Sequence, residues 1–326
     1  MNRLETISNE LKTMMAKYNT QSVLGHLSFL MTCITNGTAQ DELCRMVSPM
    51  RQLYYLAALL MTGEADGTGE IEPEPDDWQK IVDKLVEIEG EYYNMFLPDT
   101  PEEVTDEWKK KVAVAMPTFL SYFNLGPLNF EEQVIEQIEG TYTSMNDVIE
   151  KETNLKVEDL LLFYDNLEAW CQYNFQSLGG ISKDCPLRAN WKDYTNLEIG
   201  VIDEAPEEIR KMGEERAPML TLVKDPGIKN RFRIDDLATN GLSQDKVQKM
   251  VDLLSLKREQ SDFLYYTELN PLAIRPIADL GNGMYQVFEE KRVLHAIIYL
   301  LDEICKKTSS SKARLTHNKG HYLEDK

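Results

Sequence analysis

The residues whose types and spacing could support chemistry lie near the end of the chain. His317 and His321 are four positions apart, and Glu324 follows three positions later. On a helix this spacing places two imidazoles and one carboxylate on the same face, where they could bind a divalent metal ion. Gly320 lies inside the segment and weakens such a helix, and the charged composition is also typical of a frayed terminus. We therefore assign no metal ligands and expect no cofactor.

No other group of residues specifies a reaction. His26 and His295 lie inside apolar helical patterns, which favours a core or boundary position for both. The chain has neither a GxGxxG nor a GxxxxGK[ST] motif, so nothing indicates nucleotide binding. Acidic residues are so common that no single pair of carboxylates is informative. The catalytic residues are therefore unknown, and we expect the isolated chain not to be an enzyme.

The charge of the chain is strongly negative and unevenly distributed. The 326 residues include 35 Lys or Arg and 55 Asp or Glu, a formal net charge of −20, which disfavours nonspecific binding to nucleic acid or an anionic membrane. Between positions 64 and 107 there are 16 acidic residues and only two basic ones, Lys80 and Lys84. This stretch is either a solvated surface or an acidic binding surface of the DNA-mimic type, in which the residues of interest are Glu70, Glu72, Glu74, Asp76 and Asp77.

The cysteines and the apolar segments indicate the compartment. Five cysteines are scattered without a CxxC pair, at positions Cys33, Cys44, Cys171, Cys185 and Cys305. An odd, scattered set argues against a disulfide framework or a zinc finger and favours free thiols in a reducing environment. No apolar run reaches 18 residues, and the N-terminal segment lacks the apolar region of a signal peptide. We predict a cytoplasmic protein without a membrane span.

Helical periodicity dominates the first 215 residues. The pattern predicts helices over about 3–18, 22–34, 40–62, 76–96, 102–124, 129–152, 156–178 and 206–215. Pro49 is expected to kink the third of these, and residues 63–77 read as an acidic loop rich in Gly and Pro. Residues 187–202 are ambiguous, with a short strand near 197–201 as one option. The fold class is mainly α, a multi-helix bundle or array, with residues 1–215 as one helical domain.

The segment from 216 to 306 changes character and predicts a small α+β unit. Asp225-Pro226-Gly227 is a turn, and Leu237-Ala238-x-x-Gly241-Leu242-Ser243 resembles the turn of a helix-turn-helix. The following helix, which Ser243 is predicted to cap, would then contact DNA through its polar residues. The alternative, which we prefer, is a small helical packing unit without nucleic acid. The residues concerned are Gln244, Asp245, Lys246, Gln248 and Lys249.

A β-hairpin and a long helix complete this unit. Asn282-Gly283 is a strong type I′ turn signal between arms at 274–280 and 284–288. Pro276 would place the first arm at a sheet edge. The helix over 289–306 is apolar nearly all round, so it is either buried against two surfaces or free to bind a partner or a second copy. A basic tail over 307–326 follows, interpreted as a frayed terminus or the start of a further domain.

The last third resembles part of a known group of proteins. The run Asn270-Pro271-Leu272, then Arg275-Pro276, the Asn-Gly hairpin and the long helix resemble a segment in large bacterial proteins that carry a restriction-endonuclease-like domain after a helical N-terminal region. Lys319-Gly320 and Glu324 fit the opening helix of that domain. The resemblance covers residues 263–324 and implies that Glu324 matches a glutamate that helps to hold the nuclease metal.

The chain departs from this pattern after residue 324. A nuclease domain would need roughly 100 further residues, including a strand-borne Asp and an Asp/Glu-x-Lys pair that bind the metal. The resemblance therefore implies the N-terminal part of a longer protein, or a product that has lost its catalytic end.

These observations lead to one preferred function and two alternatives. We expect a non-catalytic interaction or regulatory module that positions or restrains a C-terminal effector such as a nuclease, with a protein or a C-terminal domain as its partner. The first alternative is an acidic protein-binding module that acts on a basic partner. The second is a metal-dependent hydrolase, which no specific motif supports.

Overall fold

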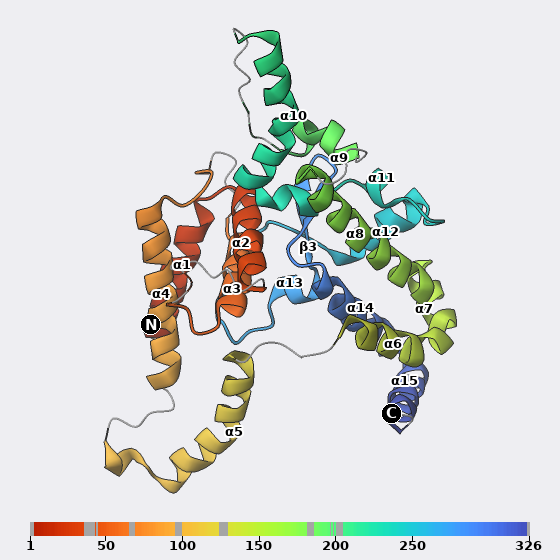
Figure 1. Ribbon diagram of the computed structural model, residues 1–326. Helices are drawn as coiled ribbons and strands as arrows, with labels where there is room; N and C mark the ends of the chain where they lie inside the picture. Colours follow the sequence, from red (N-terminus) through yellow and green to blue (C-terminus); the bar gives the residue numbers. More distant parts are fainter. Residues whose placement is uncertain are drawn as a thin grey trace. The chain divides into compact units, whose positions relative to one another are not determined.

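The computed structural model describes residues 3–35, 43, 45–64, 69–94, 100–123, 130–180, 186–195, 197, 199 and 205–324. The chain forms two compact units (Figure 1). Unit 1 comprises Met1–Leu128 together with Arg258–Asn270, and unit 2 comprises Asn129–Lys257 together with Pro271–Lys326. The contacts therefore group the residues differently from the predicted division at 215/216 and 306/307.

Unit 1 is helical, as its periodicity predicts. Helix α3 is its centre: every residue from position 52 to 61 is buried, and α1 and α2 both pack against this helix. Helix α4 packs on α1 through an apolar face that includes Ile81, Leu85 and Ile88. The described helices are α1 (Arg3–Ala16), α2 (Thr20–Thr35), α3 (Pro49–Met61), α4 (Pro75–Asn94) and α5 (Asp106–Phe123), with a short 3-10 helix η2 (Pro101–Glu103) before α5.

Pro49 does not kink a helix, which corrects the prediction. It is instead the first residue of α3. Proline is well suited to this position because its fixed φ angle is helical and its missing N–H would have no partner in the first turn.

A segment from far along the chain completes unit 1. The buried guanidinium of Arg258, which is 8% exposed, donates to four oxygens of unit 1. The acceptors are Ala16 O at 2.7 Å, Tyr18 O at 2.8 Å, Thr20 Oγ1 at 3.1 Å and Glu64 O at 2.7 Å. The segment 258–270 is therefore bonded to the ends of α1 and α2 and to the chain that follows α3.

Further bonds hold the rest of this segment. The backbone N–H groups of Glu259 and Ser261 donate to Met61 O and Thr62 O, both at 3.1 Å. The Tyr55 hydroxyl donates to Leu264 O at 2.6 Å. Because these bonds join positions about 200 residues apart, local periodicity could not have shown that 258–270 belongs with the N-terminal helices.

Unit 2 contains the remaining helices and the sheet. Its helices are α6 (Glu131–Tyr142), α7 (Asn146–Thr153), α8 (Val157–Leu178), α9 (Pro186–Ala189), α10 (Glu207–Lys224), α11 (Ile234–Leu237), α12 (Gln244–Leu254), α13 (Pro271–Ile274), α14 (Lys291–Cys305) and α15 (Ser309–Glu324). Short 3-10 helices are η3 (Thr143–Met145), η4 (Trp191–Tyr194) and η5 (Pro226–Asn230). The predicted fold class, mainly α with a small α+β unit near the C-terminus, is confirmed.

The sheet has the strand order β1-β4-β3-β2. Strands β3 and β4 form the predicted hairpin, with φ angles of 54° at Asn282 and 73° at Gly283, as a type I′ turn requires. Strand β1 pairs antiparallel with β4, and β2 pairs parallel with β3. The strands are β1 (Arg231–Phe232), β2 (Ser255–Lys257), β3 (Ile277–Gly281) and β4 (Met284–Val287).

Strand β3 is internal, so the prediction that Pro276 marks an edge strand is wrong. Pro276 directly precedes the first residue of β3, Ile277. A proline at this position removes no ladder hydrogen bond, and the strand can therefore be paired on both sides.

Helix α14 lies at the centre of unit 2. It contacts α6, α7, α8, α12, α13 and α15, and most of its apolar side chains are buried. Of the two alternatives for this helix, burial against more than one surface is therefore confirmed. The apolar face is occupied within unit 2, although Tyr299 is 46% exposed.

A fully buried ion pair lies beside the sheet. The Arg231 side chain is 0% exposed and makes two bonds to the carboxylate of Asp225, one of them from Nη2 to Oδ1 at 2.7 Å. Its Nε donates to Gln286 Oε1 at 2.7 Å and its Nη1 to Tyr194 O at 3.0 Å. The Thr195 hydroxyl donates to Asp225 Oδ2 at 2.8 Å. This network ties η4, η5, β1 and β4 together.

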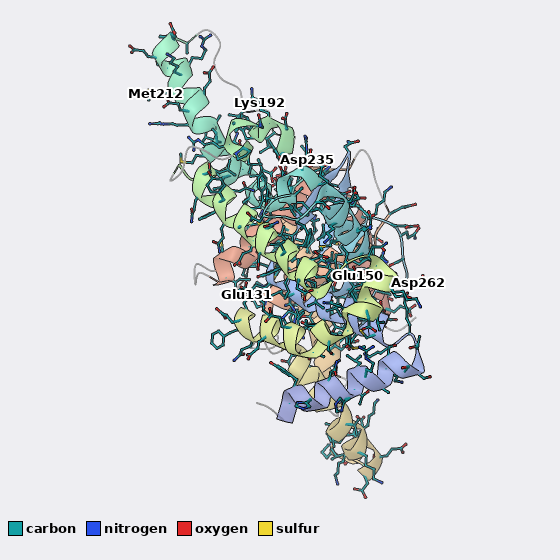
Figure 2. All side chains as sticks on the ribbon, turned by 90° about the vertical axis from the view of Figure 1, so that its right-hand side faces the viewer. Glu131, Glu150, Lys192, Met212, Asp235 and Asp262 are labelled. Carbon is teal, nitrogen blue, oxygen red and sulfur yellow. The ribbon has the colours of Figure 1, made fainter. Side chains whose placement is uncertain are left out.

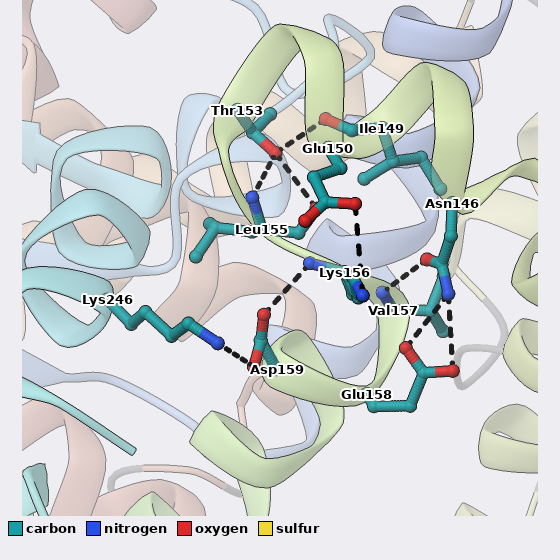
Figure 3. Close-up of polar contacts among 10 residues, drawn as sticks. All are labelled: Asn146, Ile149, Glu150, Thr153, Leu155, Lys156, Val157, Glu158, Asp159 and Lys246. Carbon is teal, nitrogen blue, oxygen red and sulfur yellow. Dashed lines mark hydrogen bonds and ion pairs between the residues drawn. The ribbon is translucent and has the colours of Figure 1, made fainter.

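The connection between α7 and α8 is fixed by side-chain bonds (Figure 3). Asn154 ends α7 with a φ of 56°, and the Lys156 N–H donates to Asp159 Oδ2 at 3.0 Å. The other carboxylate oxygen of Asp159 accepts from Lys246 Nζ of α12 at 2.6 Å. The start of α8 is thereby joined to α12.

The predicted basic tail is helical over Ser309–Glu324 and packs on α6. The Arg314 guanidinium bonds both carboxylate oxygens of Asp147, at 2.9 and 3.0 Å. A Cβ added at Gly140 would lie 2.9 Å from the Tyr322 ring, so the two helices are in close contact at this point. In this structure the tail is a part of unit 2.

Candidate interaction surface

Helix α10 is attached to unit 2 along only part of its length. Its buried residues, Ala217, Pro218 and Thr221, lie in the second half, where α10 packs against α8 and η5. In the first half, from position 207 to 216, every residue except Gly213 is exposed. In Figure 2, Met212 accordingly lies toward the free end of the helix, beyond Lys192. The N-terminal half of α10 therefore projects from unit 2.

Pro218 explains where the helix changes from attached to projecting. It lies inside α10 and has no N–H to donate to the carbonyl of Glu214. The prediction from sequence ended this helix at 215, close to the proline. The structure instead continues the helix to Lys224, because Ala217, Pro218 and Thr221 are buried against the body of the unit.

A row of exposed apolar side chains follows α10. At 100° per residue the row occupies a stripe of about 100°, centred about 160° from the buried face. With Arg216 counted, positions 209, 212, 216, 219 and 223 are separated alternately by three and four residues, as in the seam of a coiled coil, and Leu220 lies beside them. The apolar members are 41–72% exposed, and they are Ile209, Met212, Met219, Leu220 and Val223.

Arg216 lies in the middle of this row, both along the helix and around it. Within the described part of the chain its guanidinium has no ion pair or hydrogen bond. The four positions that neighbour it on the helix surface carry uncharged residues, Met212, Gly213, Met219 and Leu220. The row is therefore apolar except for one positively charged residue at its centre.

A depression of about 610 Å³ adjoins the row. Arg188 in its wall is held by its own chain: Nη1 donates to Ser177 O at 2.6 Å and Nη2 to Glu215 O at 3.2 Å. The lining residues are Gly180, Arg188, Ala189, Trp191, Glu214, Glu215, Arg216, Pro218 and Met219. Arg216 and Met219 belong to both the row and the depression, so the two form one surface, called here the α10 surface.

The α10 surface combines the exposed apolar row with four charged side chains, those of Arg188, Glu214, Glu215 and Arg216. A contiguous exposed apolar row on a helix is a common mark of a protein-binding site.

Two of the three candidate metal ligands lie close together on one helix. His317 and His321 lie on α15 with ring centroids 6.0 Å apart. The side chain of Glu324 is outside the described residues. No group of three or more His, Cys, Asp or Glu residues able to hold a metal ion occurs within the part of the chain that the structure describes.

The other two histidines are packed against neighbouring groups. His26 makes an edge contact with Trp78 at 5.6 Å between ring centroids. Burial lowers the pKa of His295 in α14, with a smaller contribution from Arg292.

The segment that resembles a helix-turn-helix packs against other parts of unit 2. Leu237 and Leu242 are fully or almost fully buried, and Asn166 of α8 donates to the carbonyls of Leu237 and Thr239 at 3.1 and 3.0 Å. Ser243 caps α12 as predicted, by accepting from the Lys246 N–H. These contacts support a packing role for the turn.

The acidic residues singled out in the sequence lie on the surface of unit 1. Glu70, Glu72, Glu74 and Asp76 are exposed. Asp77 pairs with Lys80 at 2.6 Å, and this hydrogen bond, reinforced by the lysine charge, lowers the pKa of the Asp77 carboxyl.

One acidic residue of unit 1 is buried instead. Glu89 on α4 is 6% exposed, and burial raises the pKa of its carboxyl to about 7. The charged form is therefore disfavoured at this position.

Three of the cysteines are buried free thiols. They are Cys33, Cys171 and Cys305, whereas Cys44 and Cys185 lie outside the described residues. Burial raises the pKa of the Cys171 thiol well above its usual value and that of Cys305 to about 11. A thiol in such an environment is a poor nucleophile.

The α10 surface was missed in the sequence, although its spacing was present. The spacing of three and four residues from 209 to 223 continues past Pro218. A proline at this position predicts the end of a helix, so the residues before and after it were not assigned to one helix. None of the described helices is long and apolar enough to cross a membrane. No family model, curated protein or solved structure matches this chain.

Proposed function

We propose that this chain is a non-catalytic protein-interaction module that binds a helix of its partner along α10. The observation that carries this proposal is the exposed apolar row opposite the attached face of α10. A helix that only connected two parts of unit 2 would be expected to carry polar residues there. The preferred function from the sequence, an interaction or regulatory module, thus gains a specific surface.

The row can supply useful binding energy. Complete burial of a Leu, Ile, Val or Met side chain is worth about 1.5–3 kcal/mol. Ile209, Met212 and Val223 are all at least half exposed, so a partner helix would remove a large part of their surface from water. The adjoining depression offers room for one bulky side chain of that partner.

The test uses the full-length protein and a synthetic helical peptide of about 21 residues with leucines at the a and d positions and a neutral residue at the centre. Fluorescence anisotropy should detect binding, and Met212→Asp should weaken it about tenfold or more, since a carboxylate would be placed in the seam. Lys211→Asp, about 130° around α10 from the centre of the row, is the matched control. Equal affinities for both variants, or no binding to the unmodified protein, would overturn the proposal.

A second candidate function rests on the exposure of Glu70, Glu72, Glu74 and Asp76 in unit 1. These residues support the acidic-module proposal, in which a basic protein binds this stretch. Replacement of these residues and Asp77 by the corresponding amides should abolish salt-sensitive binding of a polylysine probe of about 20 residues. Unchanged affinity would reject the DNA-mimic type of function.

The finer parts of the expected function remain proposals. The bonds of Arg314 to Asp147 and the contact of Tyr322 with Gly140 hold α15 on unit 2. They support the proposal that an effector, such as a nuclease, could be positioned through this helix. The buried thiols Cys33, Cys171 and Cys305 support the proposed reducing, cytoplasmic environment.

A further inference from the structure

Arg216 restricts which helix can cover the α10 surface. If two copies of α10 paired over the row from 209 to 223, position 216 would be opposite position 216 in either direction, because it is the midpoint of the row. Two guanidinium groups would then meet in a seam that excludes water, where like charges repel strongly. The row is therefore poorly suited to bind a second copy of itself.

The four positions nearest to Arg216 on the surface of α10 carry no acidic residue. Side chains three and four positions apart are neighbours on a helix, and those around Arg216 are Met212, Gly213, Met219 and Leu220. Glu215 is adjacent in sequence and points about 100° away around the helix. The depression beside Arg216 is lined by one further guanidinium, that of Arg188, and by the carboxylates of Glu214 and Glu215.

We infer that the partner is a helix of a different protein, with an apolar seam interrupted at its centre by one carboxylate that pairs with Arg216. Burying an unpaired guanidinium costs free energy. A carboxylate of the partner offsets this cost, because the planar guanidinium group can make two parallel hydrogen bonds to it. The apolar residues then provide affinity, and the central pair provides register and excludes self-pairing. This inference rests on the proposed function and specifies the class of partner.

The first experiment compares three peptides that differ only at the central position of the leucine seam, which carries Gln, Glu or Lys. With the full-length protein, the Glu peptide should bind about tenfold or more tightly than the Lys peptide. With Arg216→Gln, this difference should fall to less than about threefold, which shows that the preference comes from Arg216.

The three peptides separate the two claims. If the Gln peptide binds and Glu and Lys are equivalent, the acidic partner is rejected and the interaction function stands. If none of the peptides binds, both claims fail.

The second experiment needs only this chain. Sedimentation velocity should show self-association of Arg216→Leu at concentrations where the unmodified protein does not associate through α10. A mixture of Arg216→Glu with the unmodified protein should form heterodimers, because the central pair becomes complementary. Met212→Asp added to Arg216→Leu should remove the association. Self-association of the unmodified protein that Met212→Asp abolishes, or an Arg216→Leu variant that does not associate, would overturn the role assigned to Arg216.

Discussion

Each unit buries one arginine beside residues distant in sequence, and the two arginines are satisfied in different ways. Arg231 in unit 2 is fully buried and pairs with the carboxylate of Asp225. Arg258 in unit 1 is 8% exposed and donates to three backbone carbonyls and one hydroxyl. The carbonyl acceptors around Arg258 lie at helix ends and in loops, where a carbonyl has no hydrogen-bond partner within its own element.

The difference shows two uses of the same side chain. At Arg231 the buried charge is compensated by an opposite charge, so the loss of either partner leaves an isolated ion. At Arg258 the guanidinium binds the carbonyls of Ala16, Tyr18 and Glu64. Its loss leaves neutral acceptors, and an unpaired neutral acceptor costs less free energy than an unpaired charge.

The largest effect is therefore expected at Arg231. Arg231→Met should reduce the free energy of unfolding of unit 2 by about 3–5 kcal/mol, because Asp225 remains buried without its cation. Urea unfolding followed through Trp170 and Trp191 measures this. The double variant Arg231→Met, Asp225→Leu should recover much of the loss, and a double variant no more stable than the single one would contradict the comparison.

A buried carboxyl in unit 1 gives the next effect. Glu89 has a pKa raised from 4.5 to about 7 by burial, so its contribution to stability is fully present below about pH 4.5 and is lost as the pH rises through about 7. Glu89→Gln should therefore match the unmodified protein at pH 4 and be more stable by about 2 kcal/mol at pH 8. Unfolding at both pH values, followed through Trp78, provides the measurement. A difference that is the same at both pH values would exclude the titration of Glu89 as its cause.

A smaller loss is expected at Arg258 than at Arg231. Arg258→Met should destabilise unit 1 by about 1–3 kcal/mol, because the acceptors left behind are neutral. Hydrogen exchange of the Glu259 and Ser261 amides, whose acceptors are Met61 and Thr62, should accelerate even where the rest of the unit is protected. A loss larger than that of Arg231→Met would reverse the proposed order.

The smallest effect concerns a partly exposed carboxyl of unit 2. Burial, with Glu131 nearby, raises the pKa of Glu168, so the stabilising contribution is again lost as the pH rises above the normal glutamate range. Glu168→Gln should be more stable than the unmodified protein at pH 8, by less than about 1 kcal/mol because solvent screens the site. No pH dependence of this difference would show that the ionisation of Glu168 is not coupled to folding.

Signals within a few residues predicted individual helices and turns, whereas they did not show which segments pack together in one unit. The Asn282-Gly283 turn, the Ser243 cap and the apolar periodicity of α14 each act over a few residues, and all three are found as expected. The roles predicted for Pro49 and Pro276 were wrong, since proline is tolerated at the first position of a helix and directly before a strand as well as at a kink or an edge.

The assignment of 258–270 to unit 1 depends on bonds to carbonyls of residues 16, 18 and 64. A backbone carbonyl is present at every position and carries no sequence signal. The α10 surface was hidden for a different reason. Its apolar residues could be recognised as exposed only once the opposite face, Ala217 to Thr221, was seen to be buried.

The position of Arg258–Asn270 within unit 1 has a consequence for synthesis of the chain on the ribosome. Helices α1 to α5 emerge early, and the residues that complete their unit are translated only after more than 100 residues of unit 2. Until then the carbonyls of Ala16, Tyr18 and Glu64 lack the guanidinium that binds them in the finished protein. Unit 1 therefore reaches its final state late in translation, and a nascent chain that ends before residue 258 exposes an incomplete N-terminal unit to chaperones.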